Sequence, residues 1–335
     1  RYQTAHVTHA NLNEHGAIAS VSTREGVTLS ADLFIDCSGF AGLLISQGLK
    51  TPYVSFSENL FNDAAVAMPT SIDKTIPSET VSTAMKHGWA WKIPLTERFG
   101  NGYVYSSQFC SADQAESELR ERLGLLESDT PARHLKMKIG RVTKHWNKNC
   151  LAVGLSQGFI EPLEATALLF IQQTAAVFVD FLEQGDLSEA AQARFNTHVN
   201  EHFEGTRDYI VTHYKTNSRT DTEYWRANAA NLNLSEPLKQ LLNLWMSGNG
   251  IAPEVRKQSL GRGYPVFSWY SIMSGMGIFP DPGNLRPPTA EEKTFGIAEI
   301  DNLLERSAAN YKDHREVLSN IPPRRSAQTL QVYFW

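Results

Sequence analysis

The strongest constraint on this chain comes from residues 154–168, where a strand, a glycine-containing loop and a helix are predicted in immediate succession. Residues 150–153 form an apolar run typical of a buried strand, and Pro162 favours the first turn of a helix predicted from about Leu163 to Gln184. Backbone N–H groups at a helix N-terminus bind anions without a basic side chain. We therefore expect an anion or phosphate site at this junction, with Glu164 projecting into it.

Two carboxylates, Glu161 and Glu164, lie three residues apart in this stretch. They are either a general acid/base pair or the capped first turn of an ordinary helix, because carboxylates stabilise that end of any helix. The spacing leaves both interpretations open.

Composition narrows the class of protein. The 335 residues are enough to bury a substantial core, and 31 basic against 36 acidic residues give a net charge of −5, which offers no electrostatic footprint for nucleic acid or an anionic membrane. Cys37, Cys110 and Cys150 are too far apart for a zinc motif or a disulfide framework, which favours a reducing cytoplasm. His198 and His202 are four apart but belong to no HExxH pattern, so no metal site is predicted.

The N-terminal region predicts strands. Residues 5–21 alternate between apolar and polar and predict a hairpin. Residues 32–40 predict a strand with Gly39 just beyond it, where the missing side chain lets backbone approach a bulky ligand. Cofactors bind at that edge of open α/β sheets, although a structural turn explains the same pattern.

A second strand system is predicted from 88 to 110. Trp89 and Trp91 are two residues apart in an extended run and therefore share one face. Tyr103 and Tyr105 repeat this pattern after a turn predicted at residues 99–102. An aromatic wall of this kind either covers an aromatic ligand or is ordinary sheet packing.

The remaining segments predict loops and helices. Three prolines make residues 52–79 a predicted loop region. Residues 112–126 predict an amphipathic helix, and further helices are predicted at 187–211, 234–246 and 290–311.

Together these landmarks resemble the flavin-dependent halogenases of the tryptophan-halogenase type. Residues 89–94, WAWKIP, match the WxWxIP motif of that family, and residues 36–40, DCSGF, look like its flavin segment after a strand. Residues 154–167 resemble the glycine and EPLE-S/A-T block that carries the catalytic glutamate and the halide site. The three motifs occur in the order and separation of the family, which makes their combination specific.

The resemblance implies a mixed α/β fold of the FAD-dependent monooxygenase/halogenase type with a helical C-terminal region. Residues 1–50 and 138–186 would form the remainder of an FAD-binding module. Residues 51–137 would form a β-rich substrate region around WxWxIP, and residues 187–335 a mainly helical C-terminal region.

The implied activity is halogenation of an electron-rich aromatic, an indole, with chloride or bromide. It would require O2 and reduced FAD from a separate, transiently bound flavin reductase, and would proceed through hypohalous acid. One alternative is a flavin monooxygenase that hydroxylates an aromatic substrate, and another is a non-catalytic flavin- or ligand-binding relative or inactive fragment. No nucleic-acid or membrane partner is expected, and a homodimer is left open.

The resemblance also implies roles for individual residues. Glu164 would be catalytic, and the backbone amides of Thr166 and Ala167 would bind halide. Three residues would contact the flavin: Gly39, Leu155 and Leu168. The WxWxIP side chains would separate the flavin from the substrate: Trp89, Trp91, Ile93 and Pro94. Substrate contacts are expected from aromatic residues of the C-terminal half: Tyr224, Trp225, Trp269 and Tyr270.

The sequence departs from the family pattern in several places. Ala165 and Ala167 stand where serine and glycine are common. No GxGxxG opens a helix, and the lysine that activates hypohalous acid belongs to the same N-terminal part of the family; Lys92 lies within WxWxIP and does not take that role. The chain therefore resembles the C-terminal two-thirds of a halogenase.

The substrate expectation depends on charge. Residues 268–280 contain no acidic residue that could pair with the ammonium group of an amino acid. Burying an unpaired ammonium costs roughly a few kcal/mol, which favours free indole or a larger indole-containing molecule over tryptophan.

Overall fold

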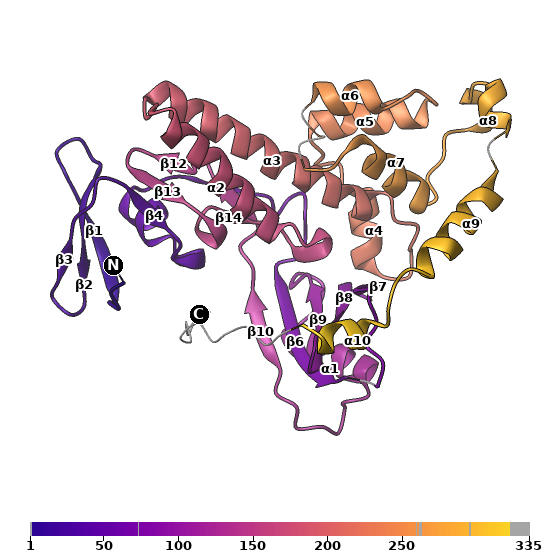
Figure 1. The fold of residues 1–335 in the computed structure, drawn as a ribbon, viewed down its shortest axis with the longest axis horizontal. Coiled ribbons are helices and arrows are strands. Elements are labelled where there is room, and N and C mark those ends of the chain that lie inside the picture. The colour runs from indigo at the N-terminus through magenta and orange to yellow at the C-terminus, as the bar shows by residue number, and fades with distance from the viewer. Residues whose placement is uncertain (1, 73, 259, 261–262, 295, 322–335) are drawn as a thin grey trace.

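The computed structural model describes residues 2–72, 74–258, 260, 263–294 and 296–321. Strands occupy the first half of the chain, and all of the regular secondary structure described after residue 186 is helical (Figure 1). The protein therefore has the predicted mixed α/β architecture with a helical C-terminal region.

The predicted N-terminal hairpin is present. β1 (Val7–Leu12) and β2 (Ile18–Thr23) pair antiparallel, and β3 (Thr28–Leu29) adds a short third strand. Ile18 and Val21 are buried in a small core against the strands that follow.

A parallel strand pair lies beside the hairpin. β4 (Phe34–Asp36) runs parallel to β13 (Cys150–Ala152), with Ile35 opposite Leu151, and β12 (Trp146–Asn147) pairs antiparallel on the far side of β13. Because parallel strands align their carboxyl ends, the chain leaves β4 and β13 at the same edge of the sheet.

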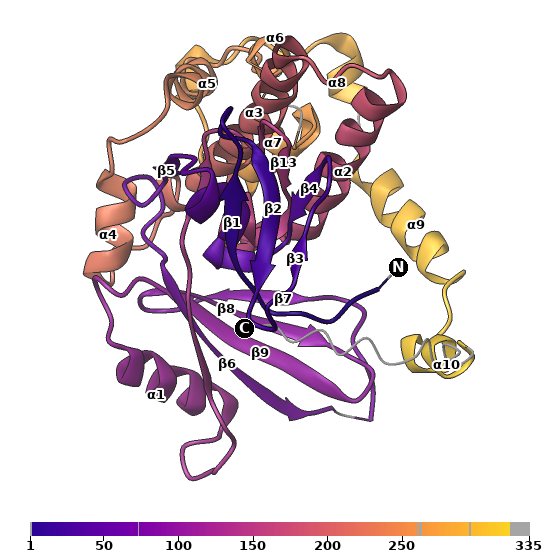
Figure 2. The ribbon, with the colours of Figure 1, turned by 90° about the vertical axis from the view of Figure 1, so that its left-hand side faces the viewer.

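The largest sheet has five antiparallel strands in the order β10, β6, β9, β8, β7. Their bounds are Arg133–Lys136, Ala64–Ser71, Arg98–Tyr105, Gly88–Pro94 and Val81–Ala84. One face is covered by α1 (Ala112–Leu123), which buries Ala115 and Leu119 (Figure 2). Trp89 and Val104 on the other face belong to the main core with the C-terminal helices.

The prediction that residues 52–79 are loop-rich was wrong, because they contain β5 (Tyr53–Ser55) and the eight-residue β6. The prolines suggested loops, but Pro69 lies in the part of β6 beyond the reach of β10, which pairs only with residues 64–67. A proline is tolerated there because no partner strand needs its missing N–H.

The turn between β8 and β9 lies earlier than predicted, at residues 95–97, and residues 99–102 are inside β9. Gly102 serves packing instead. A Cβ on Gly102 would lie 2.0 Å from the Trp91 ring, so only glycine leaves room for that indole.

Trp89 and Trp91 share a face, with ring centroids 6.1 Å apart. Tyr103 and Tyr105 do not extend their wall. They lie on the opposite face of the sheet, packed with Ala90 and α1, because directly opposed residues such as Ala90 and Tyr103 point the same way.

The junction at residues 154–168 has one more break than predicted. After η3 (Gly154–Ser156) and β14 (Gly158–Phe159), a 3₁₀ turn, η4 (Pro162–Glu164), ends at Ala165, and α2 (Ala167–Glu183) begins only then. The helix therefore starts four residues later than expected, because Ala165 adopts a left-handed conformation (φ 54°) that interrupts it.

The second half of the chain is built around α3 (Glu189–Lys215), which packs on α2, β12, α4 and α7. His202 is buried against Phe170, with ring centroids 4.7 Å apart. The other described helices are α4 (Glu223–Ala230), α5 (Glu236–Met246), α6 (Ala252–Lys257), α7 (Val266–Gly275), α8 (Ala290–Thr294), α9 (Ile297–Ala308) and α10 (His314–Ser319). Among the described residues, none of the helices combines the length and apolar character needed to cross a bilayer.

Candidate functional site

The ends of β4 and β13 meet at the predicted edge. The backbone N–H of Val153 donates to the Asp36 carbonyl at 3.0 Å, and the Ser156 hydroxyl donates to the same oxygen. Phe40 and Phe159 make an edge-to-face contact with centroids 5.7 Å apart. The segment after β4 and the loop after β13 therefore form one continuous surface.

Asp36 fixes the loop that follows β4. Its buried carboxylate accepts hydrogen bonds from the backbone and hydroxyl of Ser38 and from the backbone N–H groups of Leu44 and Ile45, at 2.6–2.9 Å. This arrangement holds Gly39 at φ 71°, and a Cβ there would meet open space. Gly39 is thus required by backbone conformation and faces an accessible area.

Three apolar side chains adjoin this loop. Phe40, Leu155 and Leu168 belong to η1 (Gly39–Ala41), η3 and α2, which pack on one another, and they remain 40%, 37% and 72% exposed. The predicted flavin positions Gly39, Leu155 and Leu168 therefore lie on neighbouring elements.

Glu164 ends η4 and is held by a histidine from α3. Its Oε1 lies 2.8 Å from Nε2 of His213, and both side chains are partly exposed. The other ring nitrogen of His213 lies 3.1 Å from the Tyr209 carbonyl oxygen. A carbonyl oxygen only accepts hydrogen bonds, so Nδ1 carries the hydrogen in this contact and Nε2 faces the carboxylate.

The N-terminus of α2 follows directly. Thr166 is its N-cap residue and makes no side-chain capping bond, and Ala167 is exposed. The first N–H groups of a helix have no intrahelical acceptor, so the backbone at Thr166 and Ala167 offers donors beside Glu164.

Glu161 has a different environment from Glu164. It is fully buried, accepts a 2.6 Å hydrogen bond from Asn62 Nδ2 and a second from the Tyr214 hydroxyl, and Asn62 in turn accepts from Tyr224 at 2.9 Å. Burial raises the pKa of Glu161 to about 7 despite these hydrogen bonds. The two carboxylates therefore separate into a buried structural acid and an accessible carboxylate.

A cavity of about 310 Å³ lies beside His213 and η4. Its walls come from β7, β8, α3, α4 and α7, and include Trp89, Leu163, Trp225 and Met276. It is large enough for a bicyclic aromatic ring, and its lining contains no aspartate or glutamate.

The WxWxIP residues are distributed along β8. Trp89 is buried at the cavity, and Trp91 packs beside it in the groove above Gly102. Ile93 is 37% exposed and, with Pro94, lies at the far end of the strand next to the hairpin turn.

The four aromatic residues predicted to contact substrate are not brought together. Trp225 lines the cavity, whereas Tyr224 is buried behind it and donates to Asn62. Trp269 is fully buried against Tyr209, and Tyr270 lines a separate, larger pocket together with Trp245 and Arg286.

Sequence reasoning missed two parts of this site. His213 is 49 residues from Glu164 and carried no motif, although its place near the end of an amphipathic helix was visible. The Asn62–Tyr214 pair that surrounds Glu161 had no local signal, because each member comes from a different element.

The site residues coincide with regions shared with known proteins. A protein-family model described as tryptophan halogenase matches residues 1–287. The chain is 36% identical over 300 residues to the tryptophan 6-halogenase SttH of Streptomyces toxytricini, covering 86% of this chain and 56% of that protein. It is 34% identical to the tryptophan 7-halogenase RebH of Lentzea aerocolonigenes, covering 90% and 59%.

Solved structures agree with this similarity. The crystal structure of SttH aligns with a TM-score of 0.84, covering 94% of this chain and 62% of that one. BrvH, a flavin-dependent halogenase from Brevundimonas sp. BAL3, aligns with a TM-score of 0.77 at 29% identity, covering 95% and 64%. The chain thus spans less than two thirds of the length of these relatives.

Proposed function

Because the chain belongs to the tryptophan halogenase family, we propose that the full-length protein halogenates an indole, using reduced FAD, O2 and chloride or bromide. The observation that carries this proposal is the Glu164–His213 pair, which lies between the uncapped start of α2 and the aromatic cavity. A carboxylate, an anion site and an aromatic pocket are the three elements that electrophilic halogenation requires of the protein.

Glu164 would stabilise the cationic ring formed when the electrophile adds, and would then accept the ring proton. A carboxylate beside a developing cation has the correct sign for both tasks. His213 is a positioning residue: its bond to Tyr209 fixes the ring, and its Nε2 holds Glu164 in one orientation.

Halide would bind to the backbone at Thr166 and Ala167. The left-handed Ala165 reverses the chain between η4 and α2, which places Glu164 and the first N–H groups of α2 next to each other. No basic side chain is needed, since the helix dipole favours an anion there.

The residues present fit the ring end of a flavin. The exposed apolar side chains of Phe40, Leu155 and Leu168 suit an aromatic ring system, and Gly39 allows close approach of the backbone. Reduced FAD would supply the electrons that activate O2 for halide oxidation, delivered by a separate reductase. The chain has no GxGxxG, so no residues are assigned to the pyrophosphate.

Trp89 and Trp91 would separate this flavin surface from the substrate cavity. Trp89 lines the cavity and Trp91 is locked beside it by the space above Gly102. A packed indole pair excludes water and keeps the substrate from direct contact with the cofactor, while Ile93 and Pro94 complete the strand.

The cavity favours a neutral indole. Arg219 is among the residues that line the cavity, and its guanidinium pairs at 2.6 Å with Asp221, which is not a lining residue. No aspartate or glutamate is among the lining residues, and the nearby Glu164 is already paired with His213, so the ammonium group of a zwitterionic amino acid would lose hydration without a free counter-charge. Free indole, or an indole on a larger molecule whose charges stay outside, fits these walls better than tryptophan.

Product analysis tests the proposal. The full-length protein is supplied with a flavin reductase, NADH, FAD, O2 and bromide, together with either indole or tryptophan. Brominated indole at a higher kcat/KM than brominated tryptophan is expected. A much higher value for tryptophan would overturn the substrate assignment, and a hydroxylated product would instead identify a monooxygenase.

A further inference from the structure

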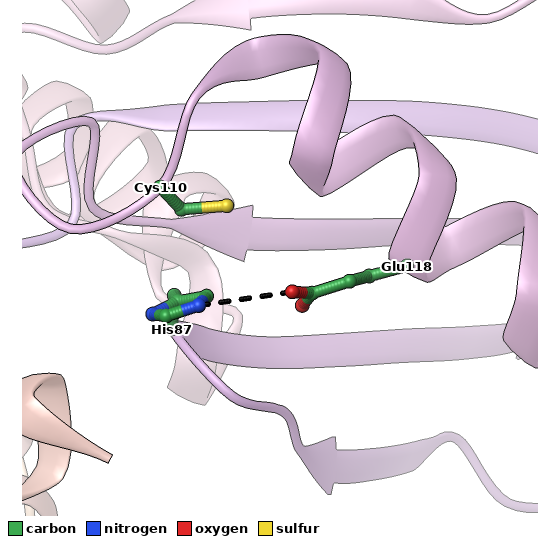
Figure 3. A group of neighbouring side chains, drawn as sticks. All are labelled: His87, Cys110 and Glu118. Carbon is green, nitrogen blue, oxygen red and sulfur yellow. Dashed lines mark ion pairs between the residues drawn. The ribbon is translucent and has the colours of Figure 1, made fainter.

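Three potential metal ligands converge on the sheet face that carries α1, on the side of the sheet away from Glu164. His87 comes from the turn before β8, Cys110 precedes the N-cap of α1, and Glu118 projects from the helix itself (Figure 3). One ligand atom from each lies within 4.8 Å of the other two. The three positions share no sequence motif. The prediction of no metal site considered only the cysteine spacing and the His198–His202 pair, so it did not cover this combination.

His87 Nε2 and Glu118 Oε1 both face one hydrogen-bond donor, the side-chain amide of Gln114. His87 Nε2 and Glu118 Oε1 are 3.7 Å apart, too far for a hydrogen bond. The amide nitrogen of Gln114 lies between them, 3.2 Å from the imidazole and 3.1 Å from the carboxylate. A cation satisfies the same two lone pairs, and rotation of the Gln114 amide by 180° would present its carbonyl oxygen as a further ligand.

The imidazole has an unmet hydrogen-bonding group. Nδ1 of His87 is buried and has no hydrogen-bond partner within the described part of the chain. No hydrogen bond on the Nδ1 side therefore fixes the orientation of the ring, and Nε2 is the nitrogen that faces Gln114 and Glu118. Coordination through one ring nitrogen would orient the ring and strengthen the N–H on the other.

The charges and donor types fit a divalent transition ion. The Glu118 side chain is only 10% exposed, and Tyr103 donates to its second oxygen at 3.2 Å. The Cys110 thiol donates to the Ser111 carbonyl at 3.4 Å. On binding, the S–H bond breaks, the proton leaves to solvent and a metal–sulfur bond forms, so that thiolate, carboxylate and dication sum to zero charge in a largely buried place.

We propose that His87, Cys110 and Glu118 bind one Zn²⁺ ion, or another divalent ion of similar preference, in a three-ligand site with a fourth position open to Gln114 or water. Nitrogen, sulfur and carboxylate oxygen are the ligands of tetrahedral zinc, and on a common ion their atoms are separated by roughly 3–4 Å. The present separations therefore need only small side-chain adjustments. A groove of about 380 Å³, lined by Glu118, provides the entry path.

The site would stabilise a turn that also shapes the aromatic cavity. The residues just before His87 accept hydrogen bonds from α4 and its approach: Met85 from the Trp225 indole at 2.8 Å, and Lys86 from the Thr222 hydroxyl at 2.8 Å. Trp225 lines the cavity. A metal ion at His87 would thus fix the segment that holds this wall in place.

Cobalt titration tests the site without any need for activity. Metal-free protein is titrated with Co²⁺, whose charge-transfer absorption with a thiolate reports a cobalt–sulfur bond, and Zn²⁺ is then added as competitor. One Co²⁺ per chain, with a thiolate band that Zn²⁺ abolishes, is expected. Absence of stoichiometric binding at micromolar metal, or a cobalt spectrum without a thiolate band, would overturn the proposal.

Matched variants assign the ligands. Cys110→Ser should abolish the thiolate band, and Glu118→Gln should weaken Co²⁺ binding by at least the roughly 10–100-fold that loss of an outer partner costs. Cys37→Ser and Cys150→Ser should leave both unchanged, because neither residue belongs to the cluster. Circular dichroism and thermal melting verify folding of each variant; if Cys110→Ser does not fold, Glu118→Gln decides. Unchanged affinity in folded Glu118→Gln protein would exclude the proposed site.

Discussion

At the scale of single residues, environment divides two glutamates of the same motif into two kinds. Glu161 is enclosed by Asn62 and Tyr214, and Glu164 reaches an accessible histidine. From the sequence alone, an acid/base pair and a capped turn were equally compatible with their spacing. The difference lies in partners supplied by distant elements, which no local pattern encodes.

The raised pKa of Glu161 makes its replacement pH-dependent. The folded state holds this proton up to about pH 7, whereas the unfolded chain releases it near 4.5, so the free energy of unfolding falls as pH rises through that window. Glu161→Gln removes this loss, and its amide can still accept from Asn62 and donate to Tyr214. Relative to wild type, the variant should gain up to roughly 3 kcal/mol between pH 4.5 and 7.5.

Urea unfolding of both proteins across this pH range measures the difference in the free energy of unfolding. Halide and flavin are left out, because a ligand that binds the folded state would add to its stability. A stability difference that does not change with pH would mean that Glu161 is ionised throughout in the folded protein.

His213 should matter through the orientation of Glu164. His213→Gln keeps a hydrogen-bond donor near the carboxylate but loses the rigid ring that the Tyr209 carbonyl orients, and hydrogen bonds to charged groups contribute about 1.5–3 kcal/mol. We expect kcat to fall by about 10–100-fold with KM little changed. His15→Gln, in an exposed His–Glu pair, is the control. A wild-type kcat in the folded His213 variant would contradict a positioning role.

At the scale of elements, periodicity predicted the type of most segments but placed several boundaries wrongly. The β1–β2 hairpin, β13, α1 and α3 follow from alternation and helical spacing. The turn before β9 was misplaced because Gly100 and Gly102 were interpreted as turn residues, although both lie within β9 and Gly102 makes room for Trp91. α2 starts late because a left-handed Ala165 costs a conformational penalty that only the surrounding structure offsets.

Gly102→Ala tests the packing of the tryptophan pair. The new Cβ would lie 2.0 Å from the Trp91 ring, so the indole must move and the variant should lose about 1–3 kcal/mol of stability, with altered tryptophan fluorescence. Gly100→Ala is the matched control on the same strand, since its Cβ meets nothing closer than 3.6 Å. The control should change stability by less than about 1 kcal/mol. Equal effects of the two substitutions would show that the space above Gly102 is not what holds Trp91.

At the scale of the whole molecule, the motifs predicted the mixed α/β architecture with its helical C-terminal region. They could not predict which distant side chains complete the site. Of the four aromatic residues expected around the substrate, Trp225 lines the cavity beside His213. Helix packing places Trp269 in the core and Tyr270 at another pocket. Such placements depend on tertiary contacts between elements more than 100 residues apart, such as Asn62 and Tyr224.

The most direct measurement compares wild type with Glu164→Gln in full-length protein, using bromide, indole and an excess of reduced FAD, with brominated product counted by mass spectrometry and FAD affinity measured in parallel. We predict brominated indole from wild type and a loss of about 10²–10⁴-fold in turnover for the variant, because a positioned acid/base group contributes that much, with FAD affinity unchanged. Turnover within a few-fold of wild type in Glu164→Gln, or a wild-type product that carries oxygen in place of bromine, would contradict it.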